Sequence, residues 1–371
     1  MTVNVENLTK KYVSADEEVV AVDNVSFEVQ SGDLFTLLGP SGCGKTTTLR
    51  CLAGLETING GSIEIAGETV STPEKSVKPE NRDIGLVFQS YALWPHMTAR
   101  ENILYALKSR GWPKDDRDNR IEECLELIGL PDIGDRYPAE LSGGQQQRIS
   151  FARAISYQPS VLLMDEPLSN LDFQQRRRMR TLLLEMLEEV GITTIYVTHD
   201  QEEAFEISDE TLVLTEGKEA QQGPPEELYQ KPESPFVADF LGEANLFQNV
   251  KINEIDKQQQ QVECTITEGT TSLEAVCTYR KDEALENPVG VVRPEDIQLN
   301  IQTDGAAQQA KMNEWQGTIR QQMYRGSFTQ NLIDIGDITV KVKTDKPLLS
   351  RGADVTVAVA PEDINLVLGH R

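Results

Sequence analysis

Short apolar runs alternate with amphipathic stretches over the first part of the chain. The runs have the length of strands and are apolar throughout, which is typical of strands buried on both faces of a parallel sheet. The stretches between them have helical periodicity, and the first of these ends at Gly54. This alternation predicts an α/β domain. Strands are expected at residues 34–38, 84–88, 161–164 and 195–198, and helices at 46–55, 117–128, 145–156 and 174–190.

The pattern changes after Gly242, where short β-rich runs are separated by Gly, Asp and Pro. A chain of 371 residues exceeds the size at which a single core is usual, so we expect two domains, residues 1–242 and 243–371. The second is predicted to be a small all-β domain of OB type, with strands at 262–267, 331–335, 338–343 and 354–360. Two of its segments, 291–299 and 358–366, resemble each other in sequence.

A glycine-rich loop follows the first apolar run. Residues 39–46 fit the pattern GxxxxGK[ST] between a predicted strand and a predicted helix. Glycines let the backbone approach phosphates, the lysine adds charge at the terminal phosphates, and the threonine hydroxyl can ligate Mg²⁺. The alternative is a chance glycine turn. The phosphate-binding interpretation predicts that ATP is held by Gly39, Pro40, Ser41, Gly42, Cys43, Gly44, Lys45, Thr46 and Thr47.

Two later apolar runs end in residues that can support hydrolysis. Asp165 and Glu166 follow the run 161–164, which places Asp165 for Mg²⁺ and Glu166 for polarising the attacking water. Adjacent acids at the end of a strand are also common as solvated turn residues. His199 closes the run 195–198 at the same end of the presumed sheet, although a lone histidine is often structural.

The segment LSGGQQQR, residues 141–148, indicates which class of ATPase holds the nucleotide. Ser142, Gly143, Gly144 and Gln145 stand at the start of a predicted helix, where bare N–H groups and the helix dipole favour an anion. With this segment the chain resembles the ABC-type ATPases. The chain already has its own phosphate loop, so the second anion site is interpreted as one offered to a nucleotide on another subunit, which implies a dimer. The other subunit is expected to be a second copy of the chain or a paralogous ATPase.

The resemblance assigns roles to three further residues. Gln89, after the run 84–88, matches the glutamine of the family that senses Mg²⁺ and the attacking water. Asp172 ends the segment 169–172, which resembles the loop that links the two sites across the dimer, although the family often has Ala where Asn170 stands. Tyr12 resembles the aromatic residue that stacks on adenine, and an ordinary edge-strand tyrosine is its alternative. The implied catalytic residues are Glu166, His199, Gln89 and Lys45, and the implied Mg²⁺ ligands are Thr46, Gln89 and Asp165.

Other segments resemble solute importers in particular. Residues 232–242 are similar to the segment that closes the cassette of such importers, and residues 293–296 are similar to a motif of their accessory OB-like (TOBE) domains. Residues 90–98 are aromatic and apolar, which suits either a docking surface for a permease or ordinary core packing. The resemblance implies uptake through membrane permease subunits, with the solute delivered by an external binding protein. Ferric iron, polyamine or phosphonate is preferred slightly over sugar as the solute.

Two other classes of ABC protein are alternatives, namely a soluble ATPase acting on DNA or ribosomes and an exporter subunit. The net charge of -25 and the pI near 4.5 disfavour nucleic acid and anionic membrane surfaces as ligands, and they favour a salt-loving organism over an ordinary acidic cytosolic protein. The sequence contains no signal peptide and no apolar run that could cross a bilayer, and its five cysteines suit a reducing cytosol. We therefore expect a peripheral protein on the cytoplasmic face of the membrane.

Overall fold

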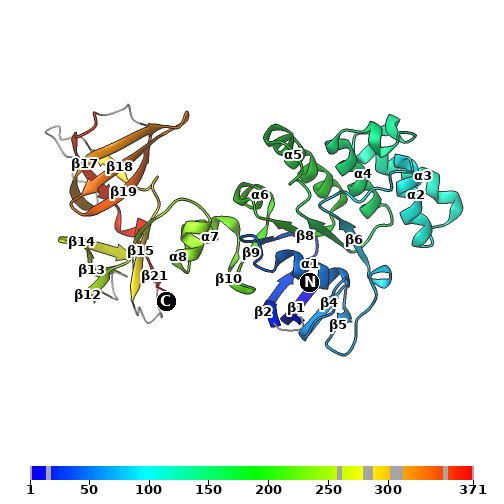
Figure 1. The fold of residues 1–371 in the computed structure, drawn as a ribbon, viewed down its shortest axis with the longest axis horizontal. Coiled ribbons are helices and arrows are strands. Elements are labelled where there is room, and N and C mark those ends of the chain that lie inside the picture. The colour runs from blue at the N-terminus through cyan, green and yellow to red at the C-terminus, as the bar shows by residue number, and fades with distance from the viewer. Residues whose placement is uncertain are drawn as a thin grey trace. The chain divides into compact units, whose positions relative to one another are not determined.

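The computed structural model describes residues 2–13, 18–256, 261–278, 287–300, 312–345 and 350–369. The chain forms two compact units, Met1–Glu226 and Glu227–Arg371. The first unit is an α/β domain and the second is all-β apart from two short helices at its start (Figure 1). Both fold classes are therefore as predicted. In the described part of the chain, no helix combines the length and apolar character needed to cross a membrane.

The centre of the first unit is a six-stranded sheet in the order β10-β9-β3-β8-β7-β6. Five strands are parallel and β10 is antiparallel to its neighbour β9. A second, four-stranded antiparallel sheet has the order β2-β1-β4-β5. The strands are β1 (Val3–Val13), β2 (Glu18–Val29), β3 (Leu34–Leu38), β4 (Gly60–Ile65), β5 (Glu68–Ser71), β6 (Ile84–Val87), β7 (Val161–Asp165), β8 (Thr193–Thr198), β9 (Glu210–Thr215) and β10 (Lys218–Gly223).

The central strands are buried on both faces, which explains why they are apolar throughout. In β7, Val161 and Leu163 pack in one core with helix α1 and the antiparallel sheet, whereas Leu162 and Met164 pack in a second core with helices α2 to α5. Successive residues of a strand point to opposite faces, so each strand contributes to both cores. The helices of this unit are α1 (Lys45–Ala53), α2 (Ala99–Ser109), α3 (Arg117–Leu127), α4 (Gly143–Ile155), α5 (Phe173–Val190) and α6 (Gln201–Ile207).

Helix α1 is fixed at its carboxyl end by Arg82, whose side chain is 1% exposed. The guanidinium donates hydrogen bonds to the carbonyls of Cys51 and Leu52 in the last turn of the helix. It also donates to the carbonyls of Val77 and Val70 and to two serine hydroxyls. Burial lowers the pKa of Arg82 to about 10. A cation among carbonyls at a helix C-terminus stabilises the helix that follows the phosphate loop.

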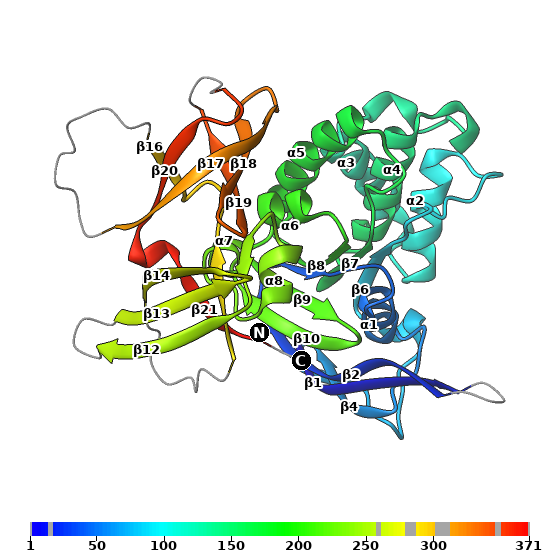
Figure 2. The same cartoon turned by 60° about the vertical axis from the view of Figure 1, so that its left-hand side comes forward.

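The second unit begins with α7 (Pro225–Gln230) and α8 (Pro235–Phe240) and continues as two packed sheets (Figure 2). Their strand orders are β11-β15-β21-β14-β13-β12 and β16-β20-β17-β18-β19, and one apolar core draws side chains from both. The strands are β11 (Asn245–Phe247), β12 (Val250–Asp256), β13 (Gln261–Glu268), β14 (Thr271–Thr278), β15 (Pro288–Val292), β16 (Gln298–Asn300), β17 (Asn313–Tyr324), β18 (Thr329–Ile335), β19 (Ile338–Thr344), β20 (Asp354–Val359) and β21 (Asn365–Leu368).

The two segments with similar sequences are each a strand, a turn and a strand. The first runs from β15 in one sheet to β16 in the other, and the second runs from β20 back to β21. Their strands pair antiparallel in one common register, because Pro288 lies opposite Leu368 in one sheet and Asn300 lies opposite Thr356 in the other. The similarity in sequence therefore reflects two matching connections between the sheets.

The units divide 16 residues before the boundary that we expected from the sequence at Gly242. Residues 227–242 belong to the second unit because Arg293, which is 5% exposed, holds them. Its guanidinium donates to the carbonyls of Ala238, Gly242 and Tyr229 and stacks at 4.0 Å from the centre of the Tyr229 ring. Burial lowers the pKa of Arg293. The end of the functional cassette at Gly242 stays a prediction.

Candidate ATP-hydrolysis site

The loop between β3 and α1 forms a backbone cradle around the end of Lys45. Lys45 is 5% exposed, and its Nζ donates to the carbonyls of Gly39 (2.7 Å) and Pro40 (2.9 Å). Glycine is required at two points of the loop, because a Cβ at Gly39 would lie 2.3 Å from Leu214 O and one at Gly44 would lie 2.5 Å from Ala21 O. The remaining residues of the loop include Cys43, which is buried and has a pKa raised by that burial, and the half-buried Thr46 and Thr47.

Thr46 lies next to the first acid of the strand β7. Its Oγ1 donates a hydrogen bond of 3.1 Å to Asp165 Oδ1. The order of strands explains the contact, because β3 and β7 flank β8 and end at the same edge of the sheet. Burial raises the pKa of Asp165, and the Thr46 hydrogen bond opposes that shift. A hydroxyl and a carboxylate side by side are the hard oxygen ligands that Mg²⁺ takes beside a phosphate.

Glu166, His199 and Gln89 form a second group at the same edge. His199 Nδ1 lies 3.1 Å from Glu166 Oε1, and Gln89 Nε2 donates to Glu166 Oε2 at 3.4 Å. Glu166 has φ +42°, a left-handed conformation that is rare outside glycine and is often stabilised at functional sites. Its N–H donates to Val197 O, which fixes this backbone against β8. The group can hold a water between a carboxylate, an imidazole and an amide.

The segment that contains Ser142 begins the helix α4. Ser142 Oγ accepts from Gln145 N–H at 3.3 Å, and Ser142 N–H donates to Gln145 Oε1 at 2.9 Å, which forms a capping box. Gly143 and Gly144 follow as the first two helical residues, whose N–H groups have no acceptor within a helix. Within the described residues, no hydrogen bond or ion pair joins this segment to the loop of Lys45. The start of α4 is therefore not held by contacts to the chain's own phosphate loop.

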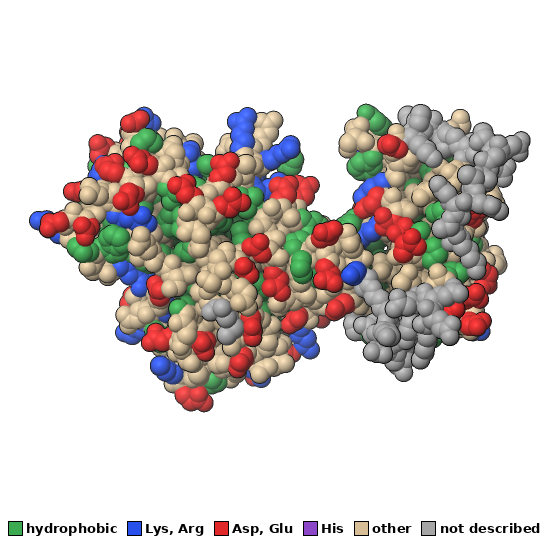
Figure 3. Space-filling view, turned by 180° about the vertical axis from the view of Figure 1, so that it is seen from behind, with side chains coloured by type: hydrophobic (Ala, Val, Ile, Leu, Met, Phe, Trp, Pro, Cys, Tyr) green, Lys and Arg blue, Asp and Glu red, His purple; other side chains and the backbone are tan. Residues whose placement is uncertain are grey.

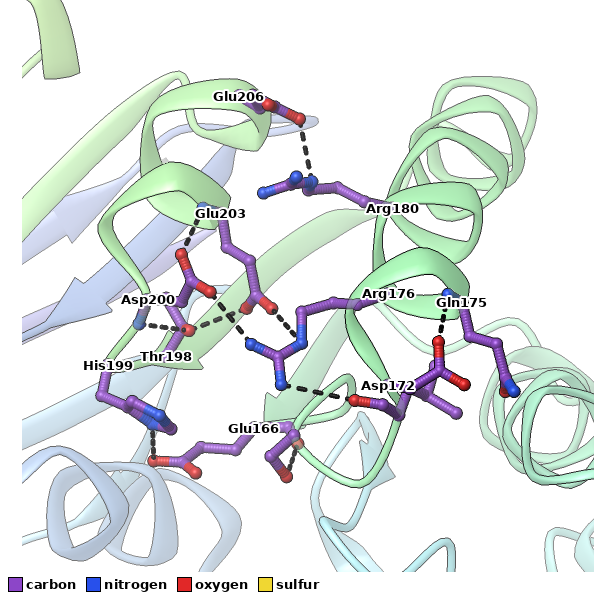
Figure 4. A network of polar contacts seen from close by, with 12 residues as sticks. Glu166, Asp172, Gln175, Arg176, Arg180, Thr198, His199, Asp200, Glu203 and Glu206 are labelled. Carbon is purple, nitrogen blue, oxygen red and sulfur yellow. Dashed lines mark hydrogen bonds and ion pairs between the residues drawn. The ribbon is translucent and has the colours of Figure 1, made fainter. Parts of the chain in front are cut away.

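Two other predicted residues lie on separate elements. Asp172 is the N-cap of α5 and accepts from Gln175 N–H at 2.9 Å (Figure 4). Tyr12 is on β1 with 39% exposure, and Lys10 Nζ lies 4.9 Å from the centre of its ring. A ring with that exposure can stack on a base.

Sequence reasoning missed the contacts that connect these groups. Asn170, which we noted only as a departure from the family, donates to Gln89 O at 2.6 Å. Arg153 on α4 donates to the carbonyls of Tyr91 and Ala92. Arg176 on α5 donates to Asp200, the neighbour of His199. Each is a polar residue inside a helix or loop, and its partner is distant in the sequence, so no local pattern signals it.

The residues present fit ATP and Mg²⁺. The glycine cradle has backbone and lysine donors for phosphates, and the oxygens of Thr46 and Asp165 suit a hard cation. When bound, Mg²⁺ would be held by these two residues and would neutralise charge on the phosphates. Phosphate binding and water activation thus meet at one edge of a parallel sheet, which is the arrangement of a phosphate-loop ATPase.

Comparisons with known proteins agree with this class. The family model described as "ABC transporter" matches residues 22–169, and that described as "TOBE domain" matches residues 290–367. The chain is 52% identical over 245 residues to the "Fe(3+) ions import ATP-binding protein FbpC" of Brucella abortus (strain 2308), a match that covers 66% of this chain and 67% of the relative. It is 54% identical over 227 residues to "Fe(3+) ions import ATP-binding protein FbpC 1" of Rhizobium meliloti (strain 1021), covering 61% and 63% respectively.

A solved structure is also similar to the first unit. The dimeric "post-hydrolysis state of the ATP-binding cassette MJ0796 bound to ADP and Pi" has a TM-score of 0.53 and 31% identity, and the match covers 60% of this chain and 98% of the other. The chain belongs to the ABC transporter ATPases, in the importer-type group that carries a TOBE domain. ATP and Mg²⁺ are accordingly its substrate and cofactor.

Proposed function

We propose that the chain hydrolyses ATP to power the import of ferric iron. The contact of His199 and Gln89 with Glu166, beside the pair Thr46 and Asp165, is the observation that carries the enzymatic part of the proposal. The ferric iron part rests on relatives at 52–54% identity whose names give that ion as the solute. The ferric ion is cargo of the complex, whereas the chain itself is proposed to hold the nucleotide and Mg²⁺.

The geometry supports a division of roles among the site residues. Lys45 moves its ammonium from the carbonyls of its own loop to the terminal phosphates of ATP, while Glu166 accepts a hydrogen bond from the attacking water. His199 orients that water and the carboxylate, and Gln89, which directly precedes the loop 90–98, donates to the same carboxylate. The charge that develops on the transferred phosphoryl group is then met by donors that are already in place.

A second copy of the chain completes each site in this proposal. Ser142, Gly143 and Gly144 present the amino end of α4 as an anion site apart from Lys45, so they serve the nucleotide of the partner subunit. Two ATP molecules are then buried between two copies, and hydrolysis separates them. The solved dimeric cassette that resembles the first unit supports this arrangement.

The permease contact is proposed at a groove of about 460 Å³ beside residues 90–98. Trp94, Tyr105, Phe88 and Tyr157 line it, and the rings of Trp94 and Tyr105 are 4.4 Å apart. Tyr105 is 48% exposed and Phe88 is 37% exposed, which suits an apolar segment of another protein. The occupant that we propose is a cytoplasmic segment of the permease, which places the chain peripherally on the cytoplasmic face of the membrane.

Arg153 connects this groove to α4. Its guanidinium lies 5.0 Å from the centre of the Trp94 ring and donates to the carbonyls of Tyr91 and Ala92, both of which have positive φ. A movement of the permease segment is thereby passed to the helix that begins at Ser142.

The acidic surface supports a further proposal, that the protein works at high salt. Asp and Glu outnumber Lys and Arg by 60 to 35, and carboxylates are spread over the face shown in Figure 3. Salt screens their mutual repulsion, because the Debye length falls to about 3 Å at 1 M.

The experiment that tests the function compares Glu166→Gln with the wild type and with Glu202→Gln, a variant of an exposed acid on α6. We expect Glu166→Gln to bind ATP and to accumulate as an ATP-dependent dimer with hydrolysis reduced at least about 100-fold. Normal turnover in this variant would remove Glu166 from its role. For the solute, uptake of ⁵⁵Fe(III) by cells with the complete transporter should be lost in Glu166→Gln and unchanged in Glu202→Gln.

A further inference from the structure

One guanidinium joins the loop before α5 to the turn that contains His199. Arg176 Nη1 donates to Asp200 Oδ2 at 3.1 Å, and its Nη2 donates to the carbonyl of Leu171 at 3.4 Å (Figure 4). Arg176 Nε lies 3.9 Å from Glu203 Oε1, an ion pair that is longer than a hydrogen bond. A single side chain therefore touches both elements.

The Asp200 end of the bridge sets the backbone next to His199. Asp200 N–H donates to Thr198 Oγ1 at 3.0 Å, so the two neighbours of His199 are bonded to each other. Thr198 Oγ1 in turn donates to Glu203 Oε2 at 2.7 Å, and the 3% exposed Glu203 also accepts from Tyr196. Asp200 Oδ1 accepts from Glu203 N–H and caps α6. His199 is half exposed, so packing holds its side chain only in part. The orientation of the imidazole toward Glu166 therefore depends on the backbone of this turn.

The Leu171 end of the bridge lies under the start of α4. Leu171 is buried and packs with Leu168 and Met179. A Cβ at Gly143 would lie 3.5 Å from Leu171 Cδ2, and one at Gly144 would lie 3.5 Å from Met179 Sδ. Gly143 thus faces Leu171, whose carbonyl accepts from Arg176, and Gly144 faces Met179 on α5.

We propose that Arg176 is a positioning residue that couples the Ser142 surface of a subunit to His199 of the same subunit. The inference rests on the proposed dimer, in which the Ser142 surface contacts the partner's nucleotide while His199 acts on the subunit's own. Closure on the partner's ATP shifts the loop at Leu171, and the shared guanidinium transmits that shift to the turn 198–200. Each site thereby senses whether the other is filled.

The same helix provides a matched control. Arg180, one turn later on α5, is 5% exposed and forms an ion pair with Glu206 on α6 at 2.8 Å (Figure 4). It bridges the same two helices as Arg176, but in the part of the chain that the structure describes it makes no hydrogen bond or ion pair with Leu171 or Asp200. A role limited to helix packing or charge balance predicts equal effects at the two arginines, whereas coupling predicts an effect at Arg176 alone.

The test measures ATP hydrolysis against ATP concentration for the wild type, Arg176→Met, Arg176→Lys and Arg180→Met, together with nucleotide affinity. In Arg176→Met we expect a Hill coefficient near one, kcat about tenfold lower and ATP affinity within about twofold of the wild type. Arg176→Lys should recover only part of kcat, because a lysine cannot span two acceptors in a planar fork. Arg180→Met should keep the wild-type Hill coefficient.

Three results would overturn the inference. One is a wild-type Hill coefficient and kcat in Arg176→Met, and another is the same loss in Arg180→Met. The third is the absence of an ATP-dependent dimer in Glu166→Gln, in which case the proposed function and this inference fail together. If that dimer forms normally and the Arg176 variants keep the wild-type cooperativity, only the inference is rejected. Should Arg176→Met unfold, the Hill coefficient of Arg176→Lys decides in the same way.

Discussion

Thr46 and Asp165, 119 residues apart in the chain, are joined by a hydrogen bond of 3.1 Å. The hydroxyl donates to the carboxylate that burial makes more basic than usual, since its pKa is raised. A bound Mg²⁺ would take over both oxygens and would favour the ionised carboxylate. Binding of the ion and loss of the proton from Asp165 are therefore linked.

This relationship predicts the behaviour of Asp165→Asn. Nucleotide binding measured in EDTA should be unchanged, while the gain in affinity on adding Mg²⁺ should disappear and hydrolysis should fall at least about 100-fold. Titration calorimetry with and without Mg²⁺ measures the difference. Asp115→Asn, at an exposed position, is the control. A Mg²⁺-dependent gain that survives in Asp165→Asn would contradict the assignment.

The exposure of Tyr12 predicts a base-specific effect. Tyr12→Ala should weaken ATP binding by about 1–3 kcal/mol, the usual contribution of stacking on a base, whereas Tyr12→Phe should bind nearly as the wild type. Inorganic triphosphate lacks a base, so its affinity should not change in either variant. Equal weakening for ATP and triphosphate in Tyr12→Ala would show that the ring supports the loop and does not hold adenine.

Arg82 provides a prediction about stability. Arg82→Met removes the cation that holds the carboxyl end of α1 and leaves several buried carbonyls without donors. We expect the free energy of unfolding to fall by about 3–5 kcal/mol. Denaturant unfolding measures the change, with Arg177→Met on the exposed face of α5 as the control. A loss below about 1 kcal/mol would mean that water replaces the lost donors.

Asp296 predicts a dependence on pH in the second unit. Burial, followed by the charges of Asp363 and Glu295, raises its pKa from 3.8 to about 6. The folded state then holds more protons than the unfolded state between these values, so the contribution of Asp296 to stability falls as pH rises from about 4 to 6. Above pH 6 the ionised carboxylate is a cost.

Replacing Asp296 with Asn should remove that cost. We expect Asp296→Asn to raise the free energy of unfolding by about 1–2 kcal/mol at pH 7, less than the whole shift implies because the carboxyl is partly exposed, and to change it little at pH 3.5. Thermal unfolding of both proteins across this range measures the difference. A constant difference at all pH values would place its origin in packing.

The net charge predicts a dependence on salt. The melting temperature should rise as KCl increases from about 0.1 M to above 1 M, because screening shortens the range of carboxylate repulsion from about 10 Å to 3 Å. NaCl at the same ionic strength is the control, since screening alone does not distinguish the two cations. Equal stability in dilute buffer and in concentrated KCl would reject adaptation to salt.

The sequence predicted the parts of the fold that local pattern determines. β7 and β8 are predictable because burial on both faces makes a parallel strand apolar along its length. α4 and α5 are predictable because a capping residue precedes a stretch of helical periodicity in each. The sheet β2-β1-β4-β5 was missed, because its strands are partly exposed and have polar residues in irregular alternation. Its pairing depends on segments that are far apart in the chain.

The candidate site was predictable where residue types have a fixed chemistry, as in the loop 39–46. The connections between its parts were not. Arg176 stands in the run Arg176-Arg177-Arg178, which indicates a solvated basic face, and nothing local shows that one of the three turns toward Asp200. Likewise, the sequence shows Asn170 only as a departure from the Ala that is common in the family. Its side-chain amide donates to the carbonyl of Gln89, a contact that depends on how the two loops lie in the fold.

The continuous register between the β15–β16 and β20–β21 segments has a consequence for synthesis. β21 lies between β15 and β14 in its sheet, so each of these two earlier strands lacks one of its neighbours until residues 365–368 emerge from the ribosome. The first unit has all of its strands by Gly223 and can fold while the rest is being translated. The ATPase core is therefore complete well before the β unit closes, and the nascent β unit exposes the unpaired edges of its sheet for the longest time.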